Sequence, residues 1–301
     1  MISDHKLMQE INKVFNRVAA DNLSGSGGLL RQLIQGLLEC CSRDQHLSMA
    51  EKRVLEHILI DFLQKMQDFA IIRHFTDRLL NHVQSRESIT FGDICDYVLS
   101  YRQSWSDVQT RQAIFFLNHF PLKGKTILTH SQSSTVQEII LAHTNPKELR
   151  IIQTESRPAM EGRRQARKLA ESGFEVILIT DTGYTPLLKD TEMVLLGADT
   201  VYSDIFINKC GTWALALLAR KHDIPVYVVA DSRKFIKEPA PPELIVPGNK
   251  PPEEILEFPP DRVNPLNHYF EAIPTRSVTA FITEDHIIPG QEMPLTALEK
   301  K

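Results

Sequence analysis

The sequence is poor in cysteine and contains no long apolar run. Its four cysteines, Cys40, Cys41, Cys95 and Cys210, show no Cys-x-x-Cys spacing. This argues against a structural zinc site and favours four free thiols in a reducing compartment. A membrane-spanning helix needs about 20 apolar residues, and a signal peptide needs an apolar core near the N-terminus. Neither occurs in the sequence, so we expect a cytoplasmic protein that does not bind a membrane.

An excess of positive charge is also missing. The 301 residues include 34 Lys and Arg against 38 Asp and Glu, which gives a formal net charge of −4. No basic stretch is interleaved with aromatic residues, so direct binding of nucleic acid is not expected. The phosphate-binding pattern GxxxxGK[ST] is absent as well, and nothing in the sequence calls for a metal or a cofactor. The composition, with 42% hydrophobic and 24% charged residues, is that of a soluble globular protein.

The apolar pattern divides the chain into two parts. In residues 1–122 apolar side chains recur every three or four positions, for example at Leu55, Ile58, Leu59 and Phe62, which is typical of packed amphipathic helices. Residues 123–301 instead contain short apolar runs of the length of buried parallel strands. These runs cover 126–130, 149–154, 176–181, 193–199, 226–231 and 278–283.

Helical segments at 162–172 and 212–222 separate some of these runs, and this alternation predicts a βαβ-type sheet. The fold class expected is therefore α/β, with a helical N-terminal domain (1–122) and a mostly parallel sheet domain (123–301). A proline-rich connection at 239–260 joins the fifth and sixth runs. We expect it to form an ordered excursion or a partner contact.

Polar residues follow several of the predicted strands. The strand ends carry His130 and Ser131, the segment 154–157, Asp181, and Asp199. Since open parallel sheets bind ligands at the carboxyl ends of their strands, we expect a polar crevice at this edge. A serine hydrolase is not expected, because neighbours in a strand point in different directions and no GxSxG motif surrounds Ser131.

A glycine-rich turn in the N-terminal part is a candidate phosphate site. It consists of Ser24, Gly25, Ser26, Gly27 and Gly28, and a serine N-cap is expected to open the helix that follows. Backbone N–H groups and the helix dipole favour phosphate oxygens at such a turn. The alternative is an ordinary turn between two helices.

Arg157 is a candidate anion-binding residue. It follows the second predicted strand and precedes a proline, and its guanidinium could donate two hydrogen bonds to a phosphate or a carboxylate. The alternative is a surface ion pair with Glu155 or Glu161.

A second polar cluster lies further along the chain. Asp199 ends a strand, and Asn208 and Lys209 precede a helix nine residues on. Together with the N–H groups of that helix they offer a carboxylate, an amide and an ammonium group, which could hold a phosphorylated polyol or move a proton. The alternative for Asn208 is a helix cap. Cys210 is interpreted as a packed thiol rather than a reactive one.

These motifs, in this order, resemble a known family. The segments are Ile-Leu-Thr-His-Ser at 127–131, Thr-Glu-Ser-Arg-Pro at 154–158 with Gly162, Gly-Ala-Asp at 197–199, Asn-Lys-Cys-Gly-Thr at 208–212, and Tyr-Val-Val-Ala-Asp at 227–231. They are similar to the translation initiation factor 2B alpha/beta/delta family, which includes methylthioribose-1-phosphate isomerase and ribose-1,5-bisphosphate isomerase. The resemblance implies a Rossmann-like C-terminal domain, a homodimer formed through it, and a sugar-phosphate crevice between the domains. It also implies that the turn at 24–28 is the counterpart of a phosphate-binding turn, and that Arg157, Asn208 and Lys209 bind substrate.

The chain departs from the isomerases at the catalytic pair. The resemblance implies a cysteine and an aspartate, and here Asp199 is retained whereas Ser131 stands at the cysteine position. A serine hydroxyl is a poorer acid or base near neutral pH than a thiol. The Asn-Gly of the family is absent from residues 200–207, and Arg-Gly-Ala is absent from the N-terminal turn.

Two functions follow from the resemblance. The first is a regulatory protein of translation initiation that binds a sugar phosphate or a nucleotide, and a protein partner, without catalysis. The alternative is a diverged aldose–ketose isomerase acting on a phosphorylated pentose, with Asp199 as acid and base and with Ser131 or a water replacing the thiol.

Overall fold

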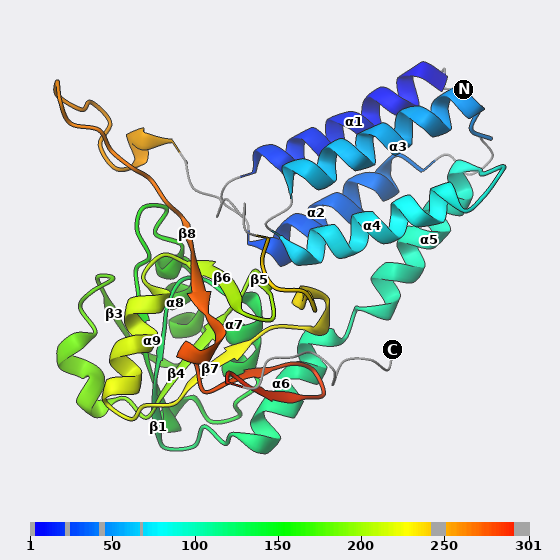
Figure 1. The fold of residues 1–301 in the computed structure, drawn as a ribbon. Coiled ribbons are helices and arrows are strands. Elements are labelled where there is room, and N and C mark those ends of the chain that lie inside the picture. Colours follow the sequence, from blue (N-terminus) through cyan, green and yellow to red (C-terminus); the bar gives the residue numbers. More distant parts are fainter. Residues whose placement is uncertain (1–3, 22–24, 42–45, 67–68, 242–250, 292–301) are drawn as a thin grey trace. The chain divides into compact units, whose positions relative to one another are not determined.

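The computed structural model describes residues 4–21, 25–41, 46–66, 69–241 and 251–291. It divides into two compact units, Met1–Asp107 and Val108–Lys301. The α/β fold expected from the sequence is confirmed, with helices first and a mostly parallel sheet after them (Figure 1). Among the described residues no helix is both long and apolar enough to span a membrane.

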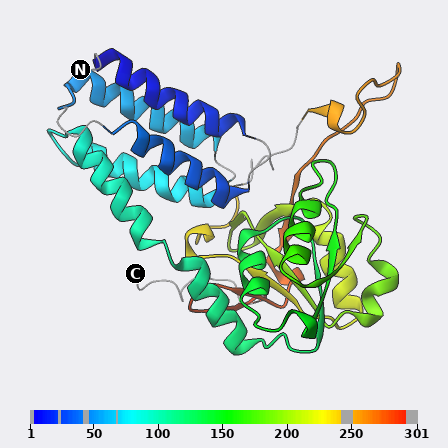
Figure 2. The ribbon, with the colours of Figure 1, turned by 180° about the vertical axis from the view of Figure 1, so that it is seen from behind.

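The first unit is built from helices that share one apolar core. They are α1 (Asp4–Ala20), α2 (Ser26–Glu39), α3 (Met49–Lys65), α4 (Ala70–Gln84) and α5 (Phe91–Ser104). Figure 2 shows them packed alongside one another. Ser48 begins α3, and Thr90 begins α5, by accepting a hydrogen bond from the backbone three residues on while a carboxylate there reaches back. These capping boxes satisfy N–H groups that the helix itself leaves unpaired.

Two of the cysteines expected to be free form a disulfide. Cys41, just after α2, is bonded to Cys95 in α5, with Cα atoms 6.3 Å apart. The expectation was wrong because spacing along the chain does not reveal that α2 and α5 pack against the same core. Cys40 and Cys210 are free thiols. The cysteines therefore give no support for a reducing compartment.

The second unit contains the parallel sheet. Its helices are α6 (Val108–His119), α7 (Ser134–Leu141), α8 (Glu161–Glu171) and α9 (Thr212–Lys221), and its strands are β1 (Lys125–Thr129), β2 (Leu149–Thr154), β3 (Glu175–Ile179), β4 (Met193–Gly197), β5 (Thr200–Val201), β6 (Ile205–Lys209), β7 (Val226–Val229), β8 (Phe270–Pro274), β9 (Ala280–Ile282) and β10 (Ile287–Pro289). Short 3₁₀ turns lie at Pro146–Glu148, Thr185–Asp190, Ser232–Lys234, Pro252–Glu254 and Thr275–Ser277. The domain boundary expected from the sequence, after residue 122, lies beyond α6. The division into compact units lies before α6, between Asp107 and Val108.

The sheet has seven strands in the order β10-β9-β7-β4-β1-β2-β3, and only β10 runs antiparallel to its neighbour. The six apolar runs of the sequence are β1, β2, β3, β4, β7 and β9. After β1 the chain builds the sheet outward through β2 and β3, and then returns to add β4 on the other side of β1. This is a topological switch point, where open α/β sheets bind their ligands.

The inner strands of the sheet are buried on both faces, and alternate residues of these strands supply the two cores. Ile127 in β1 packs in the core with α6, α7 and α8, whereas the adjacent Leu128 packs in the core with α9. The side chains point in opposite directions because successive residues of a strand face opposite sides. The strands therefore read as continuous apolar runs in the sequence.

A second, three-stranded antiparallel sheet was not expected from the sequence. Its order is β5-β6-β8, and Lys209 of β6 lies opposite Phe270 of β8. The proline-rich connection separates β6 from β8, so the pairing of these two strands is a tertiary contact. Phe206 and Ile273 of this sheet are fully buried in the same core as α9. The sheet fixes the end of β6 beside the site described next.

Candidate functional site at the carboxyl edge of the sheet

The polar residues that follow neighbouring strands lie at one edge of the sheet. Ser131 follows β1, Arg157 follows β2 and Asp199 follows β4, and these strands are parallel neighbours. Ser131 and Asp199 thus flank the switch point between β1 and β4. Lys209 ends β6 and reaches the same group of residues through an ion pair with α8.

His130 and Ser131 point in different directions, as expected. The His130 ring is buried, with Nε2 2.8 Å from the carbonyl oxygen of Cys210 and Nδ1 2.7 Å from the Thr154 hydroxyl. Because a carbonyl can only accept, Nε2 carries the proton and Nδ1 accepts from Thr154. Burial lowers the pKa of His130. The ring joins the ends of β1, β2 and β6, whereas the Ser131 hydroxyl has a different partner, Glu161.

Ser131 is held in a rarely populated backbone conformation. Its φ is 66°, in the left-handed region, and Ser156 after β2 has the same value. The Ser131 N–H donates to Ser156 Oγ at 2.8 Å. Non-glycine residues in this region are uncommon and are found at functional sites more often than elsewhere. The two serines turn the chain at adjacent strand ends and aim the Ser131 side chain at α8.

The Ser131 hydroxyl meets a buried ion pair. Ser131 Oγ donates to Glu161 Oε1 at 2.9 Å, and Lys209 Nζ lies 2.8 Å from the same oxygen. Lys209 is 2% exposed. Glu161 reaches this position because the adjacent Gly162 lies directly against β2: a Cβ there would come within 1.9 Å of the Thr154 carbonyl oxygen. Only glycine allows α8 to approach the strand so closely.

An aromatic ring lies against Lys209, and a further carboxylate holds this ring in place. Its ammonium group lies 4.3 Å from the centre of the buried Tyr269 ring, a favourable cation–π arrangement. The Tyr269 hydroxyl donates to Glu254. Burial, with this hydrogen bond, raises the pKa of Tyr269. Lys209 is therefore a charged group with fixed partners, not a mobile surface lysine.

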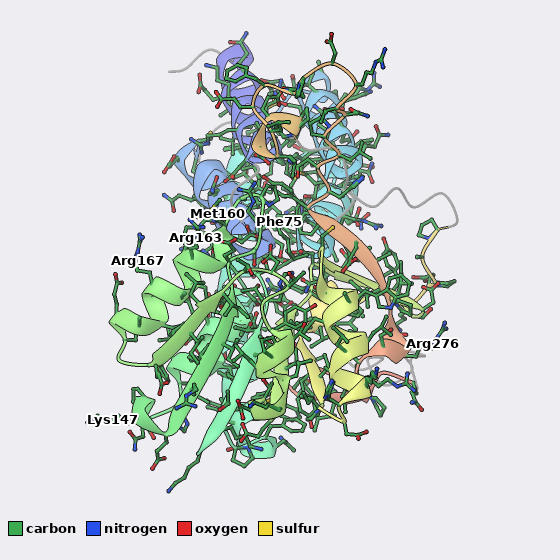
Figure 3. The ribbon with its side chains drawn as sticks, turned by 90° about the vertical axis from the view of Figure 1, so that its left-hand side faces the viewer. Phe75, Lys147, Met160, Arg163, Arg167 and Arg276 are labelled. Carbon is green, nitrogen blue, oxygen red and sulfur yellow. A yellow bond between two sulfur atoms is a disulfide. The ribbon has the colours of Figure 1, made fainter. Side chains whose placement is uncertain are left out.

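The guanidinium of Arg157 is exposed, and its expected surface partners are engaged elsewhere. Glu155 pairs with Arg163 of α8, and Glu161 pairs with Lys209. The Arg157 backbone is fixed, since its N–H donates to the Asp181 carboxylate at 2.7 Å. Figure 3 shows Met160 and Arg163 near the start of α8 and Arg167 further along this helix.

Asn208 and Asp199 have backbone and side-chain contacts that fix the end of β6. Asn208 Nδ2 donates to the Thr212 hydroxyl at 3.0 Å, and that hydroxyl donates to the Lys209 carbonyl. Asn208 is not the helix cap, because the N-cap of α9 is Gly211. Asp199 is half-buried, and its N–H donates to the carbonyl of Ile207.

The N–H groups that open α9 were expected to contribute to this cluster, but a carboxylate of the protein binds them. Glu271 accepts a hydrogen bond from the Trp213 N–H at 2.8 Å and also from Gly211 and Thr212. Burial raises the pKa of Glu271. The strand β8 that carries Glu271 was not expected, so this contact could not be predicted from the sequence.

Cys210 is a packed thiol, as interpreted from the sequence. Its Sγ donates to the Phe270 carbonyl at 3.2 Å. Burial raises the pKa of the thiol to about 11. Near neutral pH the group is protonated and unreactive.

The glycine-rich turn lies in the first unit. Ser24 is outside the described residues; Gly25 is the N-cap of α2, so the expected serine cap is wrong. Ser26, Gly27 and Gly28 form the first turn of this helix, and Ser26 is buried. The helix begins earlier than expected because glycine tolerates the first turn when the apolar face that follows is buried.

Most of the polar residues at this edge of the sheet were predicted from the sequence, but the roles of Glu161, Tyr269 and Glu271 were missed. Glu161 was considered only as a surface partner for Arg157, and Tyr269 and Glu271 lie beyond the proline-rich connection. The one signal for Glu161 was its place beside Gly162, where a strand-to-helix approach requires glycine.

Comparison with known proteins shows related chains and folds. The chain is 35% identical over 175 residues to ribose 1,5-bisphosphate isomerase of Archaeoglobus fulgidus, covering 56% of this chain and 55% of that protein. It is 36% identical over 183 residues to methylthioribose-1-phosphate isomerase of Dehalococcoides mccartyi, covering 55% of each. The matched segments thus span about half the length of these relatives.

The solved structure of a translation initiation factor eIF-2B from Pyrococcus horikoshii has a similar fold, with a TM-score of 0.76 and 23% identity over 93% of this chain and 96% of that one. The family model described as the initiation factor 2 subunit family matches residues 22–290, most of the chain. The chain therefore belongs to the initiation factor 2 subunit family.

Proposed function

We propose that the protein is an aldose–ketose isomerase that acts on a phosphorylated pentose of the ribose 1,5-bisphosphate or methylthioribose 1-phosphate type. The observation that carries this proposal is the similarity, at 35% and 36% identity, to relatives named as isomerases of these two sugars. This similarity favours the isomerase, which was the alternative in the sequence analysis, over the non-catalytic regulatory function that was given first.

The polar edge of the sheet supports the proposal. Isomerisation requires a group that moves a proton between neighbouring carbons, a partner at the oxygens, and cations for the phosphate. Asp199 beside the switch point is our candidate acid and base. Arg157 is exposed, and its guanidinium can attract phosphate oxygens. Lys209, whose ammonium group is buried beside Glu161, is assigned to the substrate by the resemblance.

We also assign phosphate binding to the turn at 24–28, and substrate contacts to Asn208, following the resemblance. The first-turn N–H groups of α2 have the character of an anion site. We further propose a homodimer formed through the C-terminal domain and a cytoplasmic location, as expected from the sequence.

A second candidate function is ligand binding without turnover, in a regulatory protein that binds a sugar phosphate or a nucleotide and a protein partner. The observation that favours it is Ser131 at the position where the resemblance implies a cysteine. Its hydroxyl has a far higher pKa than a thiol and needs help to exchange a proton at neutral pH.

Proton NMR of the two sugar phosphates incubated with the protein tests both functions. We expect the anomeric signal to disappear as ketose signals grow, and Asp199→Asn to abolish this conversion while substrate binding persists in calorimetry. Line broadening without conversion would favour the second candidate. Conversion by Asp199→Asn at the wild-type rate would contradict the role of Asp199. No effect of either sugar would contradict the isomerase function and would also exclude these two sugars as ligands of the second candidate.

A further inference from the structure

Glu161 connects the Ser131 hydroxyl to the buried Lys209. One carboxylate oxygen, Oε1, accepts from Ser131 Oγ at 2.9 Å and lies 2.8 Å from Lys209 Nζ. The other oxygen, Oε2, is buried and has no hydrogen-bond partner in the described part of the chain. A buried carboxylate oxygen without a donor is unfavourable, so such groups call for an explanation.

We propose that Glu161 makes Ser131 competent for proton transfer by accepting the proton of its hydroxyl. A serine hydroxyl is weak on its own and becomes effective when an adjacent base removes its proton. Glu161 is thus a positioning residue that acts through Ser131, the group that would touch the sugar. This inference rests on the isomerase function proposed above.

The contacts around the pair fix its geometry. Ser131 is held in the left-handed conformation by the hydrogen bond from its N–H to Ser156 Oγ. Glu161 is held by Lys209, which balances its charge in a buried position, and by the close approach of Gly162 to β2. Short, well-oriented contacts of this kind are required for a proton relay.

The reaction can be written with all protons accounted for. In the aldose 1-phosphate, Ser131 Oγ takes the proton from C2 while its own proton passes to the Glu161 carboxylate. The C2–H electron pair forms a C1=C2 double bond, the C1–O4 bond breaks, and its pair stays on O4, which takes a proton from Asp199 in its acid form. The relay then returns its proton to C1, and the O2–H proton goes to Asp199 as its electron pair forms the C2 carbonyl. Ser131, Glu161 and Asp199 thus all end in the protonation states in which they began.

A double-mutant cycle tests the relay, with Ser131→Ala, Glu161→Gln and the double variant, and turnover of ribose 1,5-bisphosphate followed by NMR. We expect each single substitution to lower kcat by about 100-fold or more, the usual range for loss of an acid–base group, with KM changed by less than about threefold. The double variant should be no slower than either single one, because both break the same relay.

Glu155→Gln is the matched control, because Glu155 also lies at this edge but pairs with Arg163, and it should turn over at the wild-type rate. If thermal unfolding shows that Glu161→Gln does not fold, we replace it in the cycle by Glu161→Asp, which keeps the negative charge beside Lys209. Wild-type kcat in the Glu161 variant, or losses that multiply in the double variant, would overturn the relay and leave the isomerase function standing. A wild-type protein without turnover would overturn both, so the two failures are distinguishable.

Discussion

Lys209 Nζ lies 2.8 Å from Glu161 Oε1, and the two side chains are only 3% and 13% exposed. They belong to β6 and α8, elements on different parts of the second unit. An ion pair removed from water is stable only when its partners satisfy each other, and loss of one partner leaves a buried charge. This pair therefore ties the carboxyl edge of the sheet to the start of α8.

Lys209→Met should destabilise the protein by about 3–5 kcal/mol, because it leaves Glu161 charged and buried without its cation. The free energy of unfolding from urea titration measures the effect. Lys65→Met is the control: Lys65 pairs with Asp61 at 2.6 Å, but both are about half exposed, and such pairs contribute only about 0–1 kcal/mol. An equal loss of unfolding free energy in the two variants would show that the buried ion pair stabilises the protein no more than the exposed one. Adding Glu161→Met to Lys209→Met should recover part of the loss.

Arg157→Met should weaken binding of ribose 1,5-bisphosphate by about 10–100-fold. Hydrogen bonds to charged groups contribute about 1.5–3 kcal/mol, and about 1.4 kcal/mol corresponds to a factor of ten. Isothermal calorimetry gives the dissociation constant. Arg167→Met removes an exposed arginine from α8, further along this helix than Arg163 (Figure 3), and this variant should bind the sugar as the wild type does. If both variants bind alike, Arg157 is a surface residue without a ligand.

Removal of the disulfide should lower stability. Cys41→Ser with Cys95→Ser opens a link between residues 54 positions apart, and the loss of a disulfide costs about 2–4 kcal/mol. Guanidinium unfolding with and without a reducing agent measures it. Cys40→Ser, next to the disulfide in the sequence, should have a much smaller effect. A thiol titration of the unreduced, denatured protein that finds all four cysteines reactive would contradict the pairing.

Stability should fall as the pH is lowered below about 6.5, the ordinary pKa of histidine. Burial lowers the pKa of His130 in the folded state, so below pH 6.5 the unfolded chain binds a proton that the native protein does not. The free energy of unfolding then decreases by up to about 1.4 kcal/mol per pH unit for this one group. In urea titrations at pH 7.5, 6.5 and 5.5, the free energy of unfolding of His130→Gln should depend less steeply on pH than that of the wild type. His222→Gln, which replaces an exposed histidine, should retain the wild-type slope. Identical slopes for all three proteins would contradict this assignment.

The sequence by itself determined the division into helices followed by a parallel sheet, since local periodicity carries that information. Six strands could be predicted as apolar runs because the inner strands of the sheet are buried on both faces. The polar edge could be predicted because the carboxyl ends of parallel strands lie at one edge. The sequence also predicted that His130 and Ser131 point in different directions, although in the structure both follow β1 and the left-handed conformation of Ser131 sets the direction of its side chain.

Only the tertiary structure decided how these residues are connected. The Cys41–Cys95 bond, the antiparallel sheet that includes β8, and the contact of Glu161 with Ser131 and Lys209 join segments that are distant in the sequence. No local pattern encodes such contacts, because they depend on which faces of separate elements pack together. The same packing that completes the core therefore determines which carboxylate meets the serine at the edge of the sheet.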